Sequence, residues 1–224
     1  FEISGTAAVI HAEGASAVST EDLVLGTVEM IPQSIKKVVQ LSDEVYDLRG
    51  EAFLRYIYDE LTYRIAKKAA DTLVAKIIAC GTVSTTTCPG VPAIASTATL
   101  GTVAAAMANL SDEANNPVIM MNKLTWATFK GLQAAGNYGY DPFEGLPIVF
   151  NETVKAYSAA STGDTYLIVG DLEQGALMNF PNGDGIAFKF DDLTLKKQDL
   201  IEVLGRQFVA IGVVAPNAFV KVTK

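Results

Sequence analysis

The chain has 224 residues, of which 50% are hydrophobic and 19% are charged, so it can bury a sizeable core in one or two globular domains. Its 17 basic and 25 acidic residues give a net charge of −8, which argues against a protein that binds the phosphate backbone of a nucleic acid. A single histidine, His11, and two cysteines exclude a disulfide framework and leave little room for chemistry based on imidazole.

The start of the chain is an acidic ribbon. Phe1 stands where a translated chain would have Met, which we interpret as the start of a trimmed or processed product. Residues 1–35 contain no Lys or Arg, and their acids are Glu2, Glu13, Glu21, Asp22 and Glu29. Val24, Val28 and Met30 recur with a period of two, which predicts a half-buried strand. Because the ribbon has few large apolar side chains, we expect it to lie against another surface.

The strongest local signal is a long amphipathic helix. Ser42 is a good N-cap and predicts a short helix that Gly50 interrupts. A second helix is predicted over residues 51–78, with apolar residues at every fourth position: Phe53, Ile57, Leu61, Ile65, Ala69, Leu73 and Ile77. At about 28 residues it would be about 42 Å long, far beyond the average helix. Three tyrosines are expected at the rim of the core or at an interface: Tyr56, Tyr58 and Tyr63.

A long uncharged stretch lies between Lys76 and Asp112. Its many Ser and Thr residues and the breakers Pro89 and Pro92 disfavour a membrane span, so we predict a loop and a turn, then a helix over 100–110. One more helix is predicted over 123–135, ended by Gly136, and strands over 117–121, 146–150, 166–171, 187–190, 201–214 and 218–222. Strands and helices mix without strict alternation, which indicates an α+β fold.

No group of residues predicts a catalytic, cofactor or metal site. Cys80 and Cys88 lie in a Thr-rich loop without a histidine, so we interpret them as free buried thiols rather than as a functional pair. A serine hydrolase would need a histidine, but His11 lies in the ribbon and no Gly-x-Ser-x-Gly elbow occurs. Carboxylates such as Asp171 and Glu173 are interpreted as solvated. We therefore predict that the chain is not an enzyme and needs no cofactor.

Five landmarks follow one another over residues 20–224. The first two are the segment 28–44, which leads into the Ser42 helix, and the long helix 51–78. The third is the corner Met121-Asn122-Lys123-Leu124-Thr125-Trp126, and the fourth is the pair of segments Gly145-Leu146-Pro147-Ile148-Val149 and Ile168-Val169-Gly170-Asp171-Leu172. The fifth is Arg206, followed by an apolar strand and Pro216-Asn217. No single motif is specific. Their ordered series resembles the major capsid proteins of tailed phages with the Hong Kong 97-type fold.

The resemblance implies an α+β fold with an extended N-terminal loop, a long spine helix, mixed sheets and an inserted axial domain. It implies that residues 1–91 and 194–224 form a peripheral domain and that residues 92–193 form the axial domain. The implied function is self-assembly through pentamer and hexamer rings into an icosahedral head that encloses DNA without sequence-specific binding. Implied partners are copies of the chain and portal, scaffold or decoration proteins, with no membrane. The implied location is the virion capsid, assembled in the bacterial host cytoplasm.

The resemblance also implies contacts between subunits. The ribbon is expected to lie on an adjacent subunit, with its acids facing basic positions on that subunit's spine helix. The candidate contact residues are Glu13, Glu21, Asp22, Glu29, Arg64, Lys67, Lys68 and Arg206. For Arg206, an intramolecular salt bridge and a contact between subunits are both open.

Two departures from the family pattern are expected. The outgoing strand of the extended loop and the arm before it are predicted to be missing. The ribbon also lacks the Lys through which some family members crosslink their subunits. Two other functions stay open: an encapsulin shell, which has the same fold and encloses enzyme cargo, and an unrelated soluble α+β enzyme or binding module, which would form no particles.

Overall fold

The computed structural model describes residues 1–5, 23–136, 139–183, 185–191 and 193–224. The chain divides into two compact units, each formed by separate stretches of sequence. Unit 1 contains residues 1–29, 74–177 and 212–224, and unit 2 contains residues 30–73 and 178–211. No helix in the described part of the chain is long and apolar enough to cross a membrane.

Unit 2 is built around β10 (Leu200–Val213), a long strand that continues past residue 211 into unit 1. Strand β3 (Gln33–Ser42) pairs with it antiparallel over ten positions, and β9 (Ala187–Asp191) pairs with its other edge. Strand β8 (Ala176–Asn179) also joins this sheet, and a 3₁₀ turn (Lys196–Gln198) precedes β10. The strands predicted at 187–190 and 201–214 are therefore confirmed, whereas β8 was not predicted.

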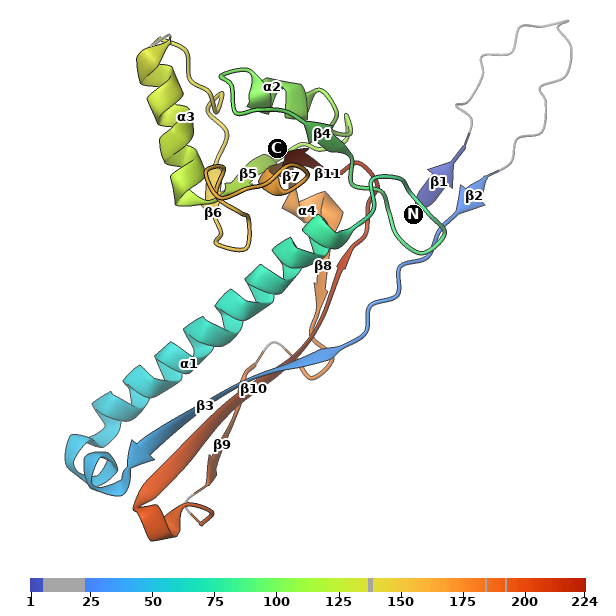
Figure 1. The fold of residues 1–224 in the computed structure, drawn as a ribbon. Helices are drawn as coiled ribbons and strands as arrows, with labels where there is room; N and C mark the ends of the chain where they lie inside the picture. Colours follow the sequence, from blue (N-terminus) through green and yellow to red (C-terminus); the bar gives the residue numbers. More distant parts are fainter. Residues whose placement is uncertain (6–22, 137–138, 184, 192) are drawn as a thin grey trace, which may run out of the picture. The chain divides into compact units, whose positions relative to one another are not determined.

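Helix α1 (Asp43–Ala79) packs its apolar stripe on one face of this sheet (Figure 1). Leu61 and Ile65 are 0% and 1% exposed, as the four-residue spacing predicted. Gly205 of β10 lies directly beneath them, because a Cβ there would stand 3.0 Å from the Ile65 side chain. The missing side chain allows the helix to approach the sheet closely.

The start of α1 corrects one prediction. The helix is continuous from Asp43, so Gly50 does not separate a short helix from a long one. A helical Gly costs only about 1 kcal/mol relative to Ala, which the flanking turns tolerate. Figure 1 nevertheless shows the first turns set at an angle to the rest of the helix.

Unit 1 contains a five-stranded mixed sheet in the order β4-β11-β7-β5-β6. Its strands are β4 (Ala93–Ala95), β5 (Pro117–Met121), β6 (Ile148–Phe150), β7 (Thr165–Asp171) and β11 (Phe219–Thr223). Helices α2 (Thr102–Met107) and α3 (Lys123–Ala135) pack on one face through Val103 and Phe129, and α4 (Leu172–Gly175) follows β7. Every residue of β7 is buried because the strand is central and covered on both faces.

Helix α3 begins where the sequence predicted it. The Asn122 side chain accepts a hydrogen bond from the backbone N–H of Leu124 at 3.0 Å, which caps the helix. The helix ends before Gly136, also as predicted. On this helix Thr125 is 0% exposed, whereas Trp126 is 38% exposed.

The ribbon has both an outgoing and a returning strand. Strand β1 (Glu2–Ser4) pairs antiparallel with β2 (Val24–Leu25), so the prediction that the outgoing strand is missing was wrong. Residues 26–32 belong to no strand, which corrects the period-two prediction there. The intervening residues 6–22, with Glu13, Glu21 and Asp22, lie outside the described residues.

Candidate assembly surfaces

The root of the ribbon is fastened within unit 1. The backbone N–H of Thr27 donates a hydrogen bond to the carbonyl oxygen of Thr86 at 2.9 Å. Thr86 belongs to a loop, residues 81–91, whose ends are tied by a hydrogen bond from the Val91 N–H to the Gly81 carbonyl at 2.9 Å. The ribbon is therefore anchored to a closed loop that directly follows α1.

The same region contains a buried lysine on strand β11. Lys221 is 6% exposed, and its Nζ donates hydrogen bonds to the carbonyls of Ile78 at 3.2 Å and Cys80 at 2.6 Å. These carbonyls belong to the end of α1, where the helix dipole favours a positive charge. Burial lowers the pKa of Lys221. In the sequence this residue is a single Lys between Val220 and Val222, a pattern that did not predict a role for it.

Beyond its root, the ribbon presents uncovered apolar side chains. Leu23 and Leu25 are 61% and 63% exposed. Glu29, the described member of the predicted acidic contacts, is also exposed. A two-stranded ribbon of this size is marginal in water by itself, so these side chains gain most from a surface outside the chain.

The outer face of α1 in unit 2 carries two of the three tyrosines that were expected at the rim of the core or at an interface. Tyr56 and Tyr63 lie two turns apart on the helix and are 63% and 59% exposed. Arg64 donates a hydrogen bond to Glu60 at 2.6 Å and lies over the Tyr63 ring at 5.9 Å. Tyr58 differs, because it packs edge-on against Phe188 and Phe190 of β9.

The predicted basic contacts of α1 lie close to these tyrosines in sequence. Lys68 is exposed and Lys67 is half-buried. The hydrogen bond between Arg64 and Glu60 is exposed, so it contributes little to stability and is available to exchange partners. The structure therefore places aromatic and basic groups within one stretch of the helix surface.

Arg206 lies in β10, opposite Lys36 of β3. Its guanidinium lies 5.1 Å from the ring centre of Phe208, two positions along the same strand. Among the ion pairs between described residues, none includes Arg206, so the first of the two open alternatives, an intramolecular salt bridge, is not found there. Two cationic residues directly opposite each other repel, which leaves this strand pair suited to an external acid. The contact between subunits stays a prediction.

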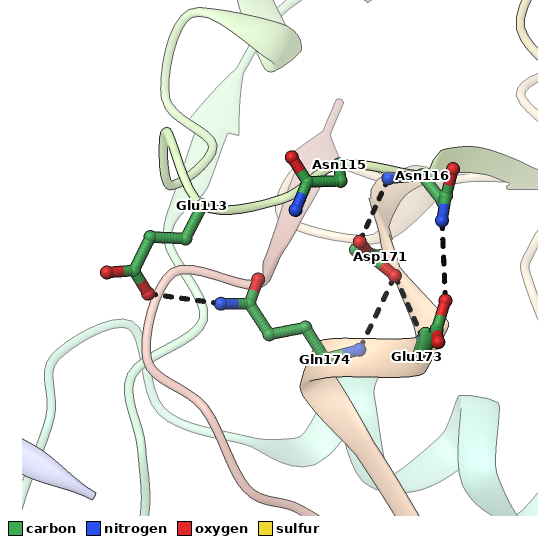
Figure 2. Close-up of a pocket in the computed structure, with 6 residues that line it drawn as sticks. All are labelled: Glu113, Asn115, Asn116, Asp171, Glu173 and Gln174. Carbon is green, nitrogen blue, oxygen red and sulfur yellow. Dashed lines mark hydrogen bonds between the residues drawn. The ribbon is translucent and has the colours of Figure 1, made fainter.

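A polar pocket of about 340 Å³ lies in unit 1 (Figure 2). It is lined by Glu113, Asn115, Asn116, Asp171, Glu173 and Gln174. Its side chains largely satisfy one another: Asn116 donates to Glu173 at 3.3 Å and Gln174 donates to Glu113 at 3.2 Å. Within the described ranges, no group of three His, Cys, Asp or Glu is placed to hold a metal ion.

Asp171 at the centre of this pocket is buried, so the prediction that it is solvated was wrong. It is 3% exposed rather than solvated, whereas Glu173 is exposed as expected. Its carboxylate accepts hydrogen bonds from the backbone N–H groups of Asn116 at 3.0 Å and Glu173 at 2.9 Å. These bonds, that from Asn116 foremost, lower the pKa of Asp171. The pocket therefore joins the end of β7 to the start of β5.

In a comparison with family models, the model described as the phage capsid family matches residues 2–224. A search of curated proteins found no match. Among solved structures, the capsid of an empty GTA particle, computed with C5 symmetry, is 12% identical, with a TM-score of 0.72 over 100% of this chain and 82% of that chain.

Two further solved structures are similar over the whole chain. A structure from Gordonia phage Cozz is 15% identical, with a TM-score of 0.58 over 100% of this chain and 79% of that one. The holo-SrpI encapsulin complex from Synechococcus elongatus PCC 7942 is 12% identical, with a TM-score of 0.60 over 100% and 81%. These similarities confirm the predicted α+β fold of the Hong Kong 97 type.

The first prediction concerns Lys221. Lys221→Met removes the donor from two helix-end carbonyls and should lower the free energy of unfolding by about 1–3 kcal/mol. Urea unfolding of the unassembled chain measures this change. Lys76→Met is the matched control, because Lys76 is exposed in the last turn of the same helix and should cost at most about 1 kcal/mol. Equal losses in the two variants would contradict the assigned role.

The second prediction concerns the pH dependence that Asp171 confers. Because the folded pKa lies below the ordinary value of about 3.9, the ionised carboxylate stabilises the fold above that value, and this stabilisation disappears as pH falls through the folded pKa. Asp171→Asn should cost about 1–3 kcal/mol at pH 7. The difference in free energy of unfolding between this variant and wild type should narrow below about pH 4.

Urea unfolding between neutral and acidic pH measures the Asp171 effect. Glu173→Gln is the control, since this exposed side chain makes one 3.3 Å hydrogen bond and should change stability by less than about 0.5 kcal/mol. A gap between Asp171→Asn and wild type that does not depend on pH would count against the charge-assisted contacts.

Proposed function

Because this chain belongs to the phage capsid family, and is a shell-forming major capsid protein, we propose that it assembles through pentamer and hexamer rings into an icosahedral head that encloses DNA. The observation that carries the proposal is the ribbon, which is anchored at Thr27 and leaves Leu23 and Leu25 uncovered. Exposed apolar side chains on a marginal two-stranded ribbon are stabilised when another surface covers them. Head-to-tail contacts that close on rotation produce rings.

The ribbon of one subunit is proposed to lie on the outer face of a neighbour's α1. Tyr56 and Tyr63 supply exposed aromatic surface there, and Arg64, Lys67 and Lys68 supply positive charge against an acidic ribbon. Each exposed ion pair contributes only about 0–1 kcal/mol, so charge sets the register of the contact while apolar burial stabilises it.

The proposed subunit has the two domains that the resemblance implies. Residues 92–193 would form the axial domain and residues 1–91 and 194–224 the peripheral domain. The proposed axial domain contains an edge strand, β6, whose Val149 and Phe150 are 43% and 45% exposed. An uncovered strand edge with apolar side chains is a natural contact for a further copy around a ring axis.

The proposed partners follow from the proposed assembly into a shell. The shell would enclose DNA without sequence-specific binding, and the net charge of −8 limits adhesion of the shell to its contents. Portal, scaffold and decoration proteins are further proposed partners, and assembly is proposed to take place in the cytoplasm of a bacterial host. A membrane has no part in the proposal.

Electron microscopy of the purified chain tests the shell. The expected result is closed particles with five-fold and six-fold rings. A single small species in sizing, without particles, would contradict the proposal and favour a soluble module. Particles that contain protein cargo rather than DNA after purification from the host would identify an encapsulin-type compartment instead.

The ribbon contact predicts a charge effect on assembly. Reversing two lysines, as Lys67→Glu with Lys68→Glu, should slow assembly several-fold at about 0.01 M ionic strength and have little effect at about 1 M, because salt screens exposed charges. Light scattering during assembly measures the rate. The control reverses two exposed lysines elsewhere, Lys76→Glu with Lys189→Glu, which changes the net charge equally. Identical rates for both double variants would contradict the contact.

A further inference from the structure

The two cysteines converge on one acceptor at the root of the ribbon. The Cys80 thiol donates to the Pro89 carbonyl at 2.8 Å, and the Cys88 thiol donates to the same oxygen at 3.4 Å. Both are free, with Cys80 buried and Cys88 half-buried. The two thiols also interact with each other. Burial, followed by this interaction with Cys88, raises the pKa of Cys80 to about 12.

The loop between these cysteines holds them in place. The Thr85 N–H donates to the Cys88 carbonyl at 2.9 Å, and the Gly90 N–H donates to the Ser84 hydroxyl at 3.0 Å. A Cβ at Gly90 would stand 2.6 Å from the Ser84 backbone nitrogen, so the two sides of the loop are in tight contact. Cys88 is therefore positioned against Cys80 by backbone geometry, which sequence spacing alone did not indicate.

We propose that Cys80 and Cys88 form an intrachain disulfide when the protein meets an oxidising small-molecule disulfide such as oxidised glutathione, and that this bond locks loop 81–91. The structure describes the reduced form, with both thiols directed at Pro89. A shell that leaves a reducing cytoplasm for an oxidising exterior would meet this change of environment. That last step rests on the proposed function, whereas the disulfide itself does not.

The chemistry proceeds by two thiol–disulfide exchanges. Cys88 is the more exposed thiol, and its thiolate attacks one sulfur of the small disulfide, so one small thiolate leaves and takes up a proton. The Cys80 thiolate then attacks the Cys88 sulfur of the mixed disulfide and expels the second small thiolate. Two protein thiols are oxidised while one small disulfide is reduced to two thiols. The nearby Lys221 ammonium favours the Cys80 thiolate and opposes the effect of burial.

A disulfide that locks loop 81–91 would also restrain the root of the ribbon. Thr86, which accepts the hydrogen bond from Thr27, lies between the two cysteines. A bond between residues 80 and 88 encloses Thr86 in a short covalent ring and removes conformations from the unfolded chain. The ribbon root is then fixed by a covalently closed loop instead of by hydrogen bonds alone.

Mass spectrometry of the folded full-length chain tests the proposal. No Lys or Arg occurs between Lys76 and Lys123, so trypsin releases both cysteines in one peptide, residues 77–123. After treatment with oxidised glutathione, this peptide should lose the mass of two hydrogen atoms and retain no glutathione. Its fragments should lack cleavages between positions 80 and 88 until a reductant is added.

Single variants distinguish the order of attack. Cys80→Ser should leave Cys88 with a persistent glutathione adduct, whereas Cys88→Ser should leave Cys80 largely unmodified. The melting midpoint of wild type should rise on oxidation and return on reduction, and neither variant should show this shift. These readouts count thiols in the chain, so they hold even if no particle forms.

Three results would overturn the proposal. They are persistent adducts on both wild-type cysteines, disulfides only between chains, and two free thiols in the folded chain under conditions that oxidise the urea-unfolded chain. The wild-type measurement decides the matter even if a serine variant does not fold.

Discussion

The end of α1 depends on one buried ammonium group. An isolated buried charge costs several kcal/mol, so Lys221 is tolerated on β11 because two helix-end carbonyls accept its hydrogen bonds. Lys221 of β11 also pairs in register with Ile168 of β7, and Ile168 pairs with Met120 of β5. The lysine that binds the helix end is therefore part of a row of paired residues across three strands. Sheet, helix end and the loop that follows are thereby made mutually dependent.

This dependence explains why the ribbon has a firm root and an uncovered body. Loop 81–91 begins where Lys221 holds the helix end, and the loop in turn holds Thr27. Beyond Thr27 the strand pairing is short, and Leu23 and Leu25 are exposed. The described part of the chain therefore anchors the ribbon at Thr27 but leaves these apolar side chains exposed. In a family whose members form shells, a second copy is the natural source of cover for them.

Local sequence signals predicted the elements that local chemistry determines. Helix α3 matched at both ends because Asn122 caps it and Gly136 follows it, and the stripe on α1 matched because burial follows helical spacing. Strands β4 and β8 escaped prediction because each is three or four residues long and exists through its pairing with a longer strand.

The polar groups in the interior were the hardest to predict. Asp171 and Lys221 are charged residues next to apolar runs, and a sequence does not show whether backbone groups will surround them. Their partners come from distant positions, Asn116 for the carboxylate and Ile78 and Cys80 for the ammonium. The convergence of Cys80 and Cys88 on Pro89 has the same origin, because the loop backbone rather than the spacing brings the thiols together.

The weakness of each candidate surface fits the proposed assembly. Exposed ion pairs and partly covered aromatic residues contribute little individually, so an isolated wrong contact between two subunits dissociates readily. Once one contact forms in a ring, further contacts become effectively intramolecular and their contributions accumulate. A surface that bound tightly on its own would trap errors instead. The exposed Tyr56 and Tyr63 lie on α1, and the exposed Val149 and Phe150 lie on β6, so the proposed contacts are distributed over separate elements.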